Sequence, residues 1–303
     1  MIMDKRKTNI SFKKNELNLK RDFGAWLLVI PSVFLLYLCV WRPMFMGASM
    51  AFYDMKGYTR ETFVGLENFR TVFRDANFIR VLGNTCQYVL WSLLLGYFPP
   101  VILAIMLNEV LHMKKAMNFC VYLPSIIPGI VTAMMWYLLY YPDTSGLLNM
   151  ILSLIGIEPL QWLQNSKHTI MLISVSMAWG GIGSTAIFYL ASLQGINQEL
   201  YEAAVIDGAG VFKRAVHITI PQISGVMLLF LVRQIIGVFQ VMEQPLTMTG
   251  GGPDYASTSI ALQQYRYGFV YFQVGNAMAL GLITFLILIV LTALYMYLQK
   301  KQS

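Results

Sequence analysis

One arginine and several amide side chains interrupt a long apolar stretch near residue 235. An arginine inside a membrane span costs about 2.5–3.5 kcal/mol on insertion scales unless it faces the bundle interior or water. Two interpretations are open: Arg233 contacts a polar or acidic solute, or it forms a structural ion pair with Glu243 or with a carboxylate of a partner. At helical spacing, one stripe of this stretch contains Arg233, Gly237, Gln240 and Gln244, flanked by Gln234 and Glu243.

A second pattern lies between residues 199 and 221. Good helix formers fill residues 199–206, and Gly208 and Gly210 can supply the positive φ that ends a helix. A short helix is therefore expected here, and its small apolar face suits docking into a groove of a partner. Acidic and small residues make it a poor match for a helix that lies on lipid headgroups. The predicted docking face consists of Tyr201, Ala204, Val205 and Gly208.

The elements that must position these residues are membrane-spanning helices. Of the 303 residues, 57% are apolar and 12% are charged, and the mean hydropathy is +0.58, whereas about a quarter of residues in soluble domains are charged. About 20 apolar residues of helix cross a bilayer. We therefore predict an all-α, multi-pass membrane protein with six transmembrane helices, at residues 26–50, 81–107, 119–141, 169–193, 218–241 and 275–298.

The distribution of lysine and arginine predicts the orientation. These residues are concentrated in the amino-terminal segment, in alternate loops and at the carboxyl terminus. The positive-inside rule then places both termini in the cytoplasm, with residues 1–23 as a cytoplasmic tail, 24–299 as the transmembrane domain and 300–303 as a cytoplasmic end. The net charge of +7 needs no nucleic acid to explain it, because a cytoplasmic face accounts for it and no recognition motif for DNA or RNA occurs.

The sequence contains no pattern typical of an enzyme or of a cofactor site. No phosphate-binding GxxxxGK[ST] loop, metal-ligand spacing or convergent catalytic cluster occurs. Any ATP hydrolysis is thus expected on a separate subunit. An ion-coupled secondary transporter is the alternative, although it would need inverted repeats and intramembrane ionisable residues, and these are few here.

The pattern at 202–221 resembles the EAA loop of binding-protein-dependent ABC importer permeases. Glu202-Ala203-Ala204 is followed at the family's spacing by Gly208, Ile218 and Pro221, with Ile220 in place of the usual leucine. The resemblance implies a permease of the bacterial cytoplasmic (inner) membrane, with a cytoplasmic coupling helix between the fourth and fifth spans that docks on an ATPase. The coupling residues that it implies are Tyr201, Glu202, Ala203, Ala204, Asp207, Gly208 and Pro221.

Three further segments resemble the sugar-permease branch related to the maltose and glycerol-phosphate importers: residues 63–69, the prolines of 123–128 and Thr249-Gly250-Gly251-Gly252-Pro253. This resemblance implies an importer that translocates a sugar or oligosaccharide, including an acidic one; a permease for a non-sugar solute is the alternative. The implied partners are a second homologous permease in a heterodimer, two ATPase subunits, an extracytoplasmic solute-binding protein, the carbohydrate and membrane lipid.

The same resemblance implies where the sugar is contacted. Positions aligned through the leucine-proline pair of the third span and the EAA loop are joined by Trp179, a mid-span aromatic residue, and by the polar side chains of the fifth span. The candidate substrate-binding residues are Ser125, Gly129, Trp179, Gly181, Ser184, Arg233, Gln234 and Gln240.

Overall fold

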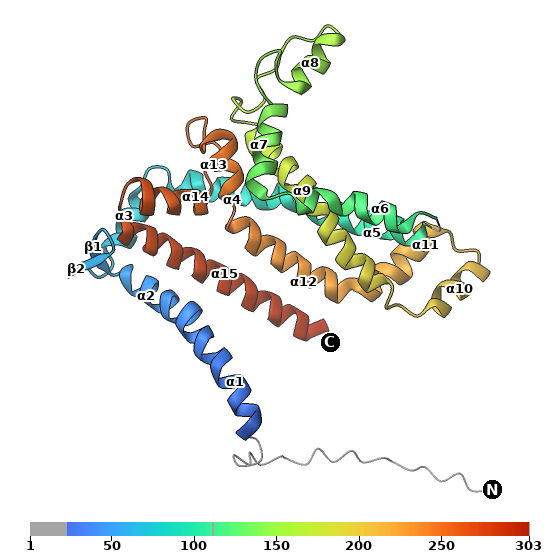
Figure 1. The fold of residues 1–303 in the computed structure, drawn as a ribbon, viewed down its shortest axis with the longest axis horizontal. Helices are drawn as coiled ribbons and strands as arrows, with labels where there is room; N and C mark the ends of the chain where they lie inside the picture. The colour runs from blue at the N-terminus through green and yellow to red at the C-terminus, as the bar shows by residue number, and fades with distance from the viewer. Residues whose placement is uncertain (1–22, 111, 303) are drawn as a thin grey trace. The chain divides into compact units, whose positions relative to one another are not determined.

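The computed structural model describes residues 23–110 and 112–302, and these residues are mostly helical (Figure 1). The chain divides into two compact units, Met1–Ser49 and Met50–Ser303. The all-α prediction is confirmed; the exception is a two-stranded hairpin in the second unit. Most of the predicted amino-terminal tail, residues 1–22, lies outside the described residues.

The first unit contains α1 (Phe23–Leu36), a π-helical turn η1 (Tyr37–Trp41) and α2 (Arg42–Met50), which ends at the unit boundary. The second unit begins with the hairpin β1 (Tyr53–Lys56) and β2 (Thr59–Phe63), followed by α3 (Glu67–Arg74), α4 (Phe78–Ser92), η2 (Leu93–Tyr97), α5 (Phe98–Glu109), α6 (Lys114–Tyr122), η3 (Leu123–Ile126), α7 (Gly129–Leu139) and α8 (Leu147–Leu154). It continues with α9 (Thr169–Leu193), α10 (Gln198–Ile206), α11 (Val211–Arg214), η4 (Ala215–Thr219), α12 (Ile220–Phe239), α13 (Glu243–Thr249), α14 (Ile260–Tyr265), η5 (Arg266–Val270) and α15 (Val274–Gln302).

Among the described residues, five helical segments are long and apolar enough to cross a membrane: Trp26–Met50, Phe78–Glu109, Thr169–Leu193, Val211–Phe239 and Val274–Tyr297. The third expected span differs from the prediction, because it is not one continuous helix. It consists of Lys114–Ile126 and Gly129–Leu139, which meet at an angle of 91°. The bend lies at Ile127 and Pro128, where the backbone is extended, since a residue before proline avoids the helical conformation. The bent pair raises the count to six spans if it crosses as one.

Prolines explain three of the π-helical turns. Proline lacks the N–H that would bond four residues back, and its ring clashes with that carbonyl. The residues four positions before Pro43, Pro99 and Pro221 lie within η1, η2 and η4 respectively. The widened turn at each place moves the carbonyl away from the ring, so the helix continues past the proline.

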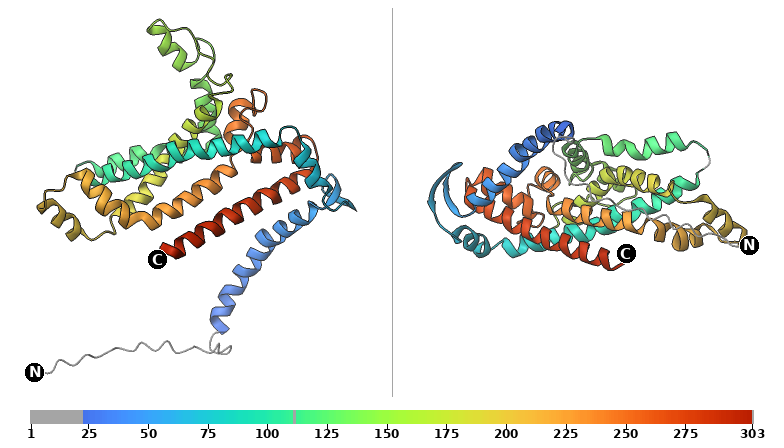
Figure 2. Two further views of the ribbon diagram at one scale, coloured as in Figure 1. Left: turned by 180° about the vertical axis from the view of Figure 1, so that it is seen from behind. Right: turned by 90° about the horizontal axis from the view of Figure 1, so that it is seen from below.

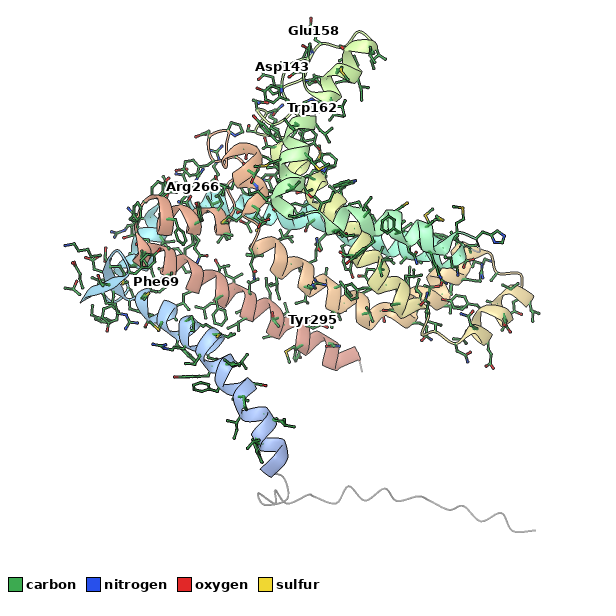
Figure 3. The ribbon with its side chains drawn as sticks, in the orientation of Figure 1. Phe69, Asp143, Glu158, Trp162, Arg266 and Tyr295 are labelled. Atoms are coloured by element: carbon green, nitrogen blue, oxygen red, sulfur yellow. The ribbon has the colours of Figure 1, made fainter. Side chains whose placement is uncertain are left out.

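In the described part of the second unit, apolar side chains form three buried clusters. One joins α4, α7, α9 and α13, and a second joins α3, α4, α14, η5 and α15. The third lies between α5, α9 and α12, near α10. Figures 1 and 2 show α10 and the hairpin at opposite ends of this unit, while α8 stands on a projection carried by α7. Figure 3 shows Asp143, Glu158 and Trp162 on that projection.

The glycine-rich segment 249–259 is fixed to one face of α4. The Asn84 side-chain amide donates to the carbonyl oxygens of Tyr255 (2.7 Å) and Thr258 (3.0 Å). One turn further along, the Tyr88 hydroxyl donates to the Ser257 carbonyl oxygen at 3.0 Å. Asn84 and Tyr88 are buried. The backbone carbonyl oxygens of this loop therefore accept hydrogen bonds from polar side chains of a spanning helix, as buried carbonyl groups require.

Candidate translocation cavities and coupling helix

Two adjoining cavities lie among the spanning helices. The larger has a volume of about 720 Å³ and the smaller about 290 Å³, and Met177 and Gly237 line both. Polar groups line each of them within largely apolar walls. Those of the larger cavity include Tyr58, Gln240, Glu243, Gln244, Gln264 and Tyr265. Those of the smaller include Ser92, Ser174, Ser184, Thr185, Arg233 and Gln234.

Arg233 lines the smaller cavity and packs over an aromatic ring. Its guanidinium carbon lies 5.7 Å from the centre of the Phe230 ring. Within the described part of the chain, no carboxylate oxygen lies within 4.0 Å of its nitrogens. The ion pair with Glu243 that the sequence left open is thus not formed, and Glu243 lines the larger cavity.

The single helical stripe expected from Arg233 to Gln244 is wrong. The helix α12 ends at Phe239, Gln240 caps it, and Glu243 begins α13. Pro245 gives the physical reason. Continuing α12 would place its ring against the Val241 carbonyl four residues back, whereas the first turn of a new helix accepts proline. The break places Gln244 on a different helix from Arg233.

Of the other candidate contact residues, some line a cavity and some do not. Gly181 and Ser184 line the smaller cavity beside Arg233. Ser125 does not line either cavity; its Oγ accepts a hydrogen bond from the Ser184 backbone N–H at 3.1 Å. A Cβ at Gly129 would lie 2.6 Å from a Glu243 carboxylate oxygen, so this glycine gives Glu243 room. Trp179 also lies outside both cavity walls and packs edge-on to Trp136, at 6.1 Å between ring centres.

The structure adds lining residues that the sequence did not indicate. Gln264 and Tyr265 lie at the end of α14, and Tyr58 lies in the hairpin turn. They come from segments outside the predicted spans, so span periodicity gave no reason to select them. The one available signal was the pair of amides, Gln263 and Gln264, directly before Tyr265.

The short helix predicted between the fourth and fifth spans is α10. Its N-cap is Asn197, whose side-chain oxygen accepts the Glu199 N–H at 3.1 Å. Gly208 follows it with φ +74°, as expected. Gly210 differs from the expectation: its φ is −69°, and it caps α11 instead. One glycine is enough to reverse the chain, because only one left-handed residue is needed at a helix carboxyl end.

The predicted docking face of α10 is only partly exposed: Val205 and Gly208 are exposed, whereas Tyr201 and Ala204 are half-buried. Tyr201 packs against the cluster between α5, α9 and α12, and its hydroxyl lies 2.9 Å from Thr219 Oγ1. It therefore faces the bundle and holds α10 to it. Val205 and Ile206 are exposed, at 55% and 86%. The outward face also includes Glu202, Ala203, Asp207 and Gly208.

Pro221 lies in the first turn of α12, directly after η4. Arg214, which ends α11, has Nη2 3.2 Å from Glu109 Oε2 at the end of α5. The beginning of the α12 span is thereby fixed to the end of α5. These contacts place α10 beside the junction of three spanning helices.

Known proteins resemble this chain over most of its length. Residues 101–303 match the family of binding-protein-dependent transport system inner membrane components. A probable ABC transporter permease protein of Bacillus subtilis, YurN, is 32% identical over 277 residues, which cover 89% of this chain and 94% of YurN. The trehalose/maltose transport system permease protein MalF of Thermococcus litoralis is 32% identical, covering 80% of this chain and 82% of MalF.

Solved structures extend the likeness to the fold. A chain of a bacterial ABC transporter involved in the import of the acidic polysaccharide alginate has a TM-score of 0.84 and 28% identity, and the match covers 93% of this chain and 97% of that one. A chain of a bacterial alginate ABC transporter in complex with an alginate pentasaccharide-bound periplasmic protein gives a TM-score of 0.83 at 28% identity, with coverage of 93% of this chain and 96% of that one. By the extent of these matches, the chain belongs to the inner membrane components of binding-protein-dependent ABC transport systems, and it is a multi-pass permease.

Proposed function

We propose that this permease is a subunit of an ATP-driven importer that translocates a saccharide delivered by an extracytoplasmic solute-binding protein. One observation carries the proposal: Val211–Phe239 is a single span with α10 beside its beginning and Arg233 and Gln234 in a cavity wall near its end. A movement of α10 can thus reach the cavity through one rigid element.

The orientation and the partners belong to the same proposal. Both termini and α10 lie in the cytoplasm, because lysines and arginines are concentrated near the termini and in the segment that follows α10, at Lys213 and Arg214. Residues 24–299 form the transmembrane domain, a second homologous permease completes a heterodimer, and two ATPase subunits bind the cytoplasmic face. The alginate transporter of similar fold, solved with its periplasmic protein, supports a solute-binding partner.

The proposed ATPase contact is the outward face of α10. Glu202, Ala203, Asp207 and Gly208 lie on it, beside the exposed side chains of Val205 and Ile206. A small helix with apolar and acidic groups and few bulky side chains fits a groove on a partner. Tyr201 and Pro221 act from behind this face, by holding α10 and by shaping the beginning of α12.

The substrate is proposed to be an oligosaccharide that carries negative charge. Amide and hydroxyl side chains line both cavities, and such groups form hydrogen bonds with sugar hydroxyls. Arg233 brings a permanent cation to the smaller cavity, and no carboxylate of the described chain neutralises it. A guanidinium binds a carboxylate with two parallel hydrogen bonds. The named substrates of the relatives, trehalose/maltose and alginate, support the saccharide class.

Replacing Arg233 tests the substrate. Proteoliposomes with the complete transporter would be assayed for uptake of an alginate trisaccharide and of trehalose, in wild type, Arg233→Gln and Arg233→Lys. A hydrogen bond to a charged group contributes about 1.5–3 kcal/mol, so alginate uptake should fall at least about tenfold in Arg233→Gln and by less in Arg233→Lys.

Trehalose is the control for general damage. Equal losses of both sugars would make Arg233 structural, and unchanged alginate uptake would refute an acidic substrate. If ATPase subunits do not copurify with the wild-type chain, the proposed importer itself is refuted.

A further inference from the structure

We infer that the hydroxyl pair of Tyr201 and Thr219 is a clamp that transmits the displacement of α10 to the α12 span; this inference rests on the proposed function. The two oxygens lie 2.9 Å apart, 18 residues apart in sequence. Tyr201 is thus a positioning residue for transport, acting behind the surface that meets the ATPase.

The clamp joins α10 to a rigid part of the chain. Thr219 is 4% exposed and lies at the end of η4, where α12 begins. Its hydroxyl can donate to the Arg214 carbonyl oxygen at 3.4 Å while it accepts from the Tyr201 hydroxyl. The Tyr201 hydroxyl therefore has this partner only when α10 is seated against the beginning of α12.

Packing of the Tyr201 ring fixes the direction of its hydroxyl. It packs against the cluster that includes Leu107, Leu193 and Ile223, from α5, α9 and α12 respectively. Ile196, buried in the same cluster, fixes the link between α9 and α10. The helix α10 is thus held at two points, and a force on its outward face acts on both α9 and α12.

The far end of α12 forms part of the wall of the smaller cavity, so a displacement of this helix moves that wall. Gln234 lies 15 residues after Thr219, which is about 22 Å along a helix. A small tilt at Thr219 is therefore carried to the wall that holds Arg233 and Gln234. The ion pair of Arg214 with Glu109 fixes the other side of this junction to α5, so α12 pivots against a held neighbour.

The experiment uses the assembled transporter with its coexpressed subunits. The three free cysteines, which are all exposed, are changed to serine, and Ala178→Cys places a thiol in the wall of the smaller cavity. ATP with vanadate traps the ATPase subunits, and the rate of maleimide labelling at position 178 reports cavity access. No saccharide is needed.

The variants are Tyr201→Phe, Thr219→Val and the two together. Each removes a hydroxyl and keeps the packing volume. The vanadate-induced change in labelling rate should fall about fivefold in either single variant, the factor that a net hydrogen bond corresponds to. It should fall no further in the double variant. Tyr122→Phe is the matched control, since this exposed tyrosine has no hydroxyl partner within the part of the chain that the structure describes.

Two further readouts separate the clamp from a structural role. Trapped ADP and copurified ATPase should stay at wild-type levels in all variants, because the outward face of α10 is unaltered. A wild-type labelling change in Tyr201→Phe, or losses that multiply in the double variant, would overturn the clamp. Loss of trapped ADP would also overturn it, since the hydroxyl would then act on docking. Failure of the wild-type chain to bind any ATPase would instead refute the proposed function.

Discussion

Gly208 offers the sharpest test of the coupling helix. It has a φ of +74°, and a Cβ built on it would meet no atom within 4 Å. Gly208→Asp is therefore strained only in its backbone, by at most about 1–2 kcal/mol, and aspartate tolerates this conformation better than most residues. The chain should still fold and insert.

The loss of function should then come from weaker binding of the ATPase subunit. If α10 lies in an ATPase groove, a carboxylate at position 208 is desolvated without a counter-charge. Leaving a charge buried and unpaired in an interface costs about 2–5 kcal/mol, or at least about thirtyfold in affinity. We expect uptake to be abolished and ATPase copurification to be lost. Gly208→Asn, of equal size without the charge, should lose less binding.

Gly156 supplies the matched control. Its φ is +77°, and it too has no atom within 4 Å of a built Cβ, but it follows α8. Gly156→Asp carries the same backbone strain and charge without facing the ATPase, so copurification should match wild type. The assays are uptake into proteoliposomes and quantitative copurification, with membrane-inserted protein measured in each sample. Wild-type transport in Gly208→Asp, or equal loss of ATPase in Gly156→Asp, would refute the coupling assignment.

Two stability predictions concern packing and the glycine-rich loop. A Cβ at Gly183 would collide with the Val121 carbonyl oxygen, whereas a Cβ at Gly181 would meet no atom within 4 Å. Gly183→Ala should therefore destabilise the detergent-purified protein by about 1–3 kcal/mol. Gly181→Ala, the control, should leave its stability unchanged. Asn84→Ala removes one buried and one partly buried hydrogen bond to the 255–258 loop and should cost about 1–3 kcal/mol. Thermal unfolding of each variant measures these changes, and a melting temperature equal to wild type in Gly183→Ala or Asn84→Ala would contradict the corresponding contact.

The sequence predicted what depends on local composition. Long apolar runs identified the spans, because the bilayer imposes one length and one polarity on every crossing helix. The helix after Asn197 and the positive φ of Gly208 were also predictable, since capping and left-handed residues are local chemistry. Pro128 could have indicated the bend in the third span, but hydropathy alone does not report bending.

Side-chain direction was not predictable to the same degree. Helical spacing placed Tyr201 on a docking face, yet its ring packs into the cluster between α5, α9 and α12. An apolar face suits a partner and the chain's own core equally well. Periodicity finds such a face but does not say what covers it.

The sequence by itself determined the membrane class, the spans and the permease family pattern, because these depend on composition and on short fixed spacings. Only the tertiary structure decided which polar groups share a cavity. Arg233 and Glu243 line different cavities because the chain breaks before Pro245, and Gln264 reaches the larger cavity from a segment outside the spans. Contacts between residues distant in sequence depend on how helices pack, and no local pattern encodes that packing.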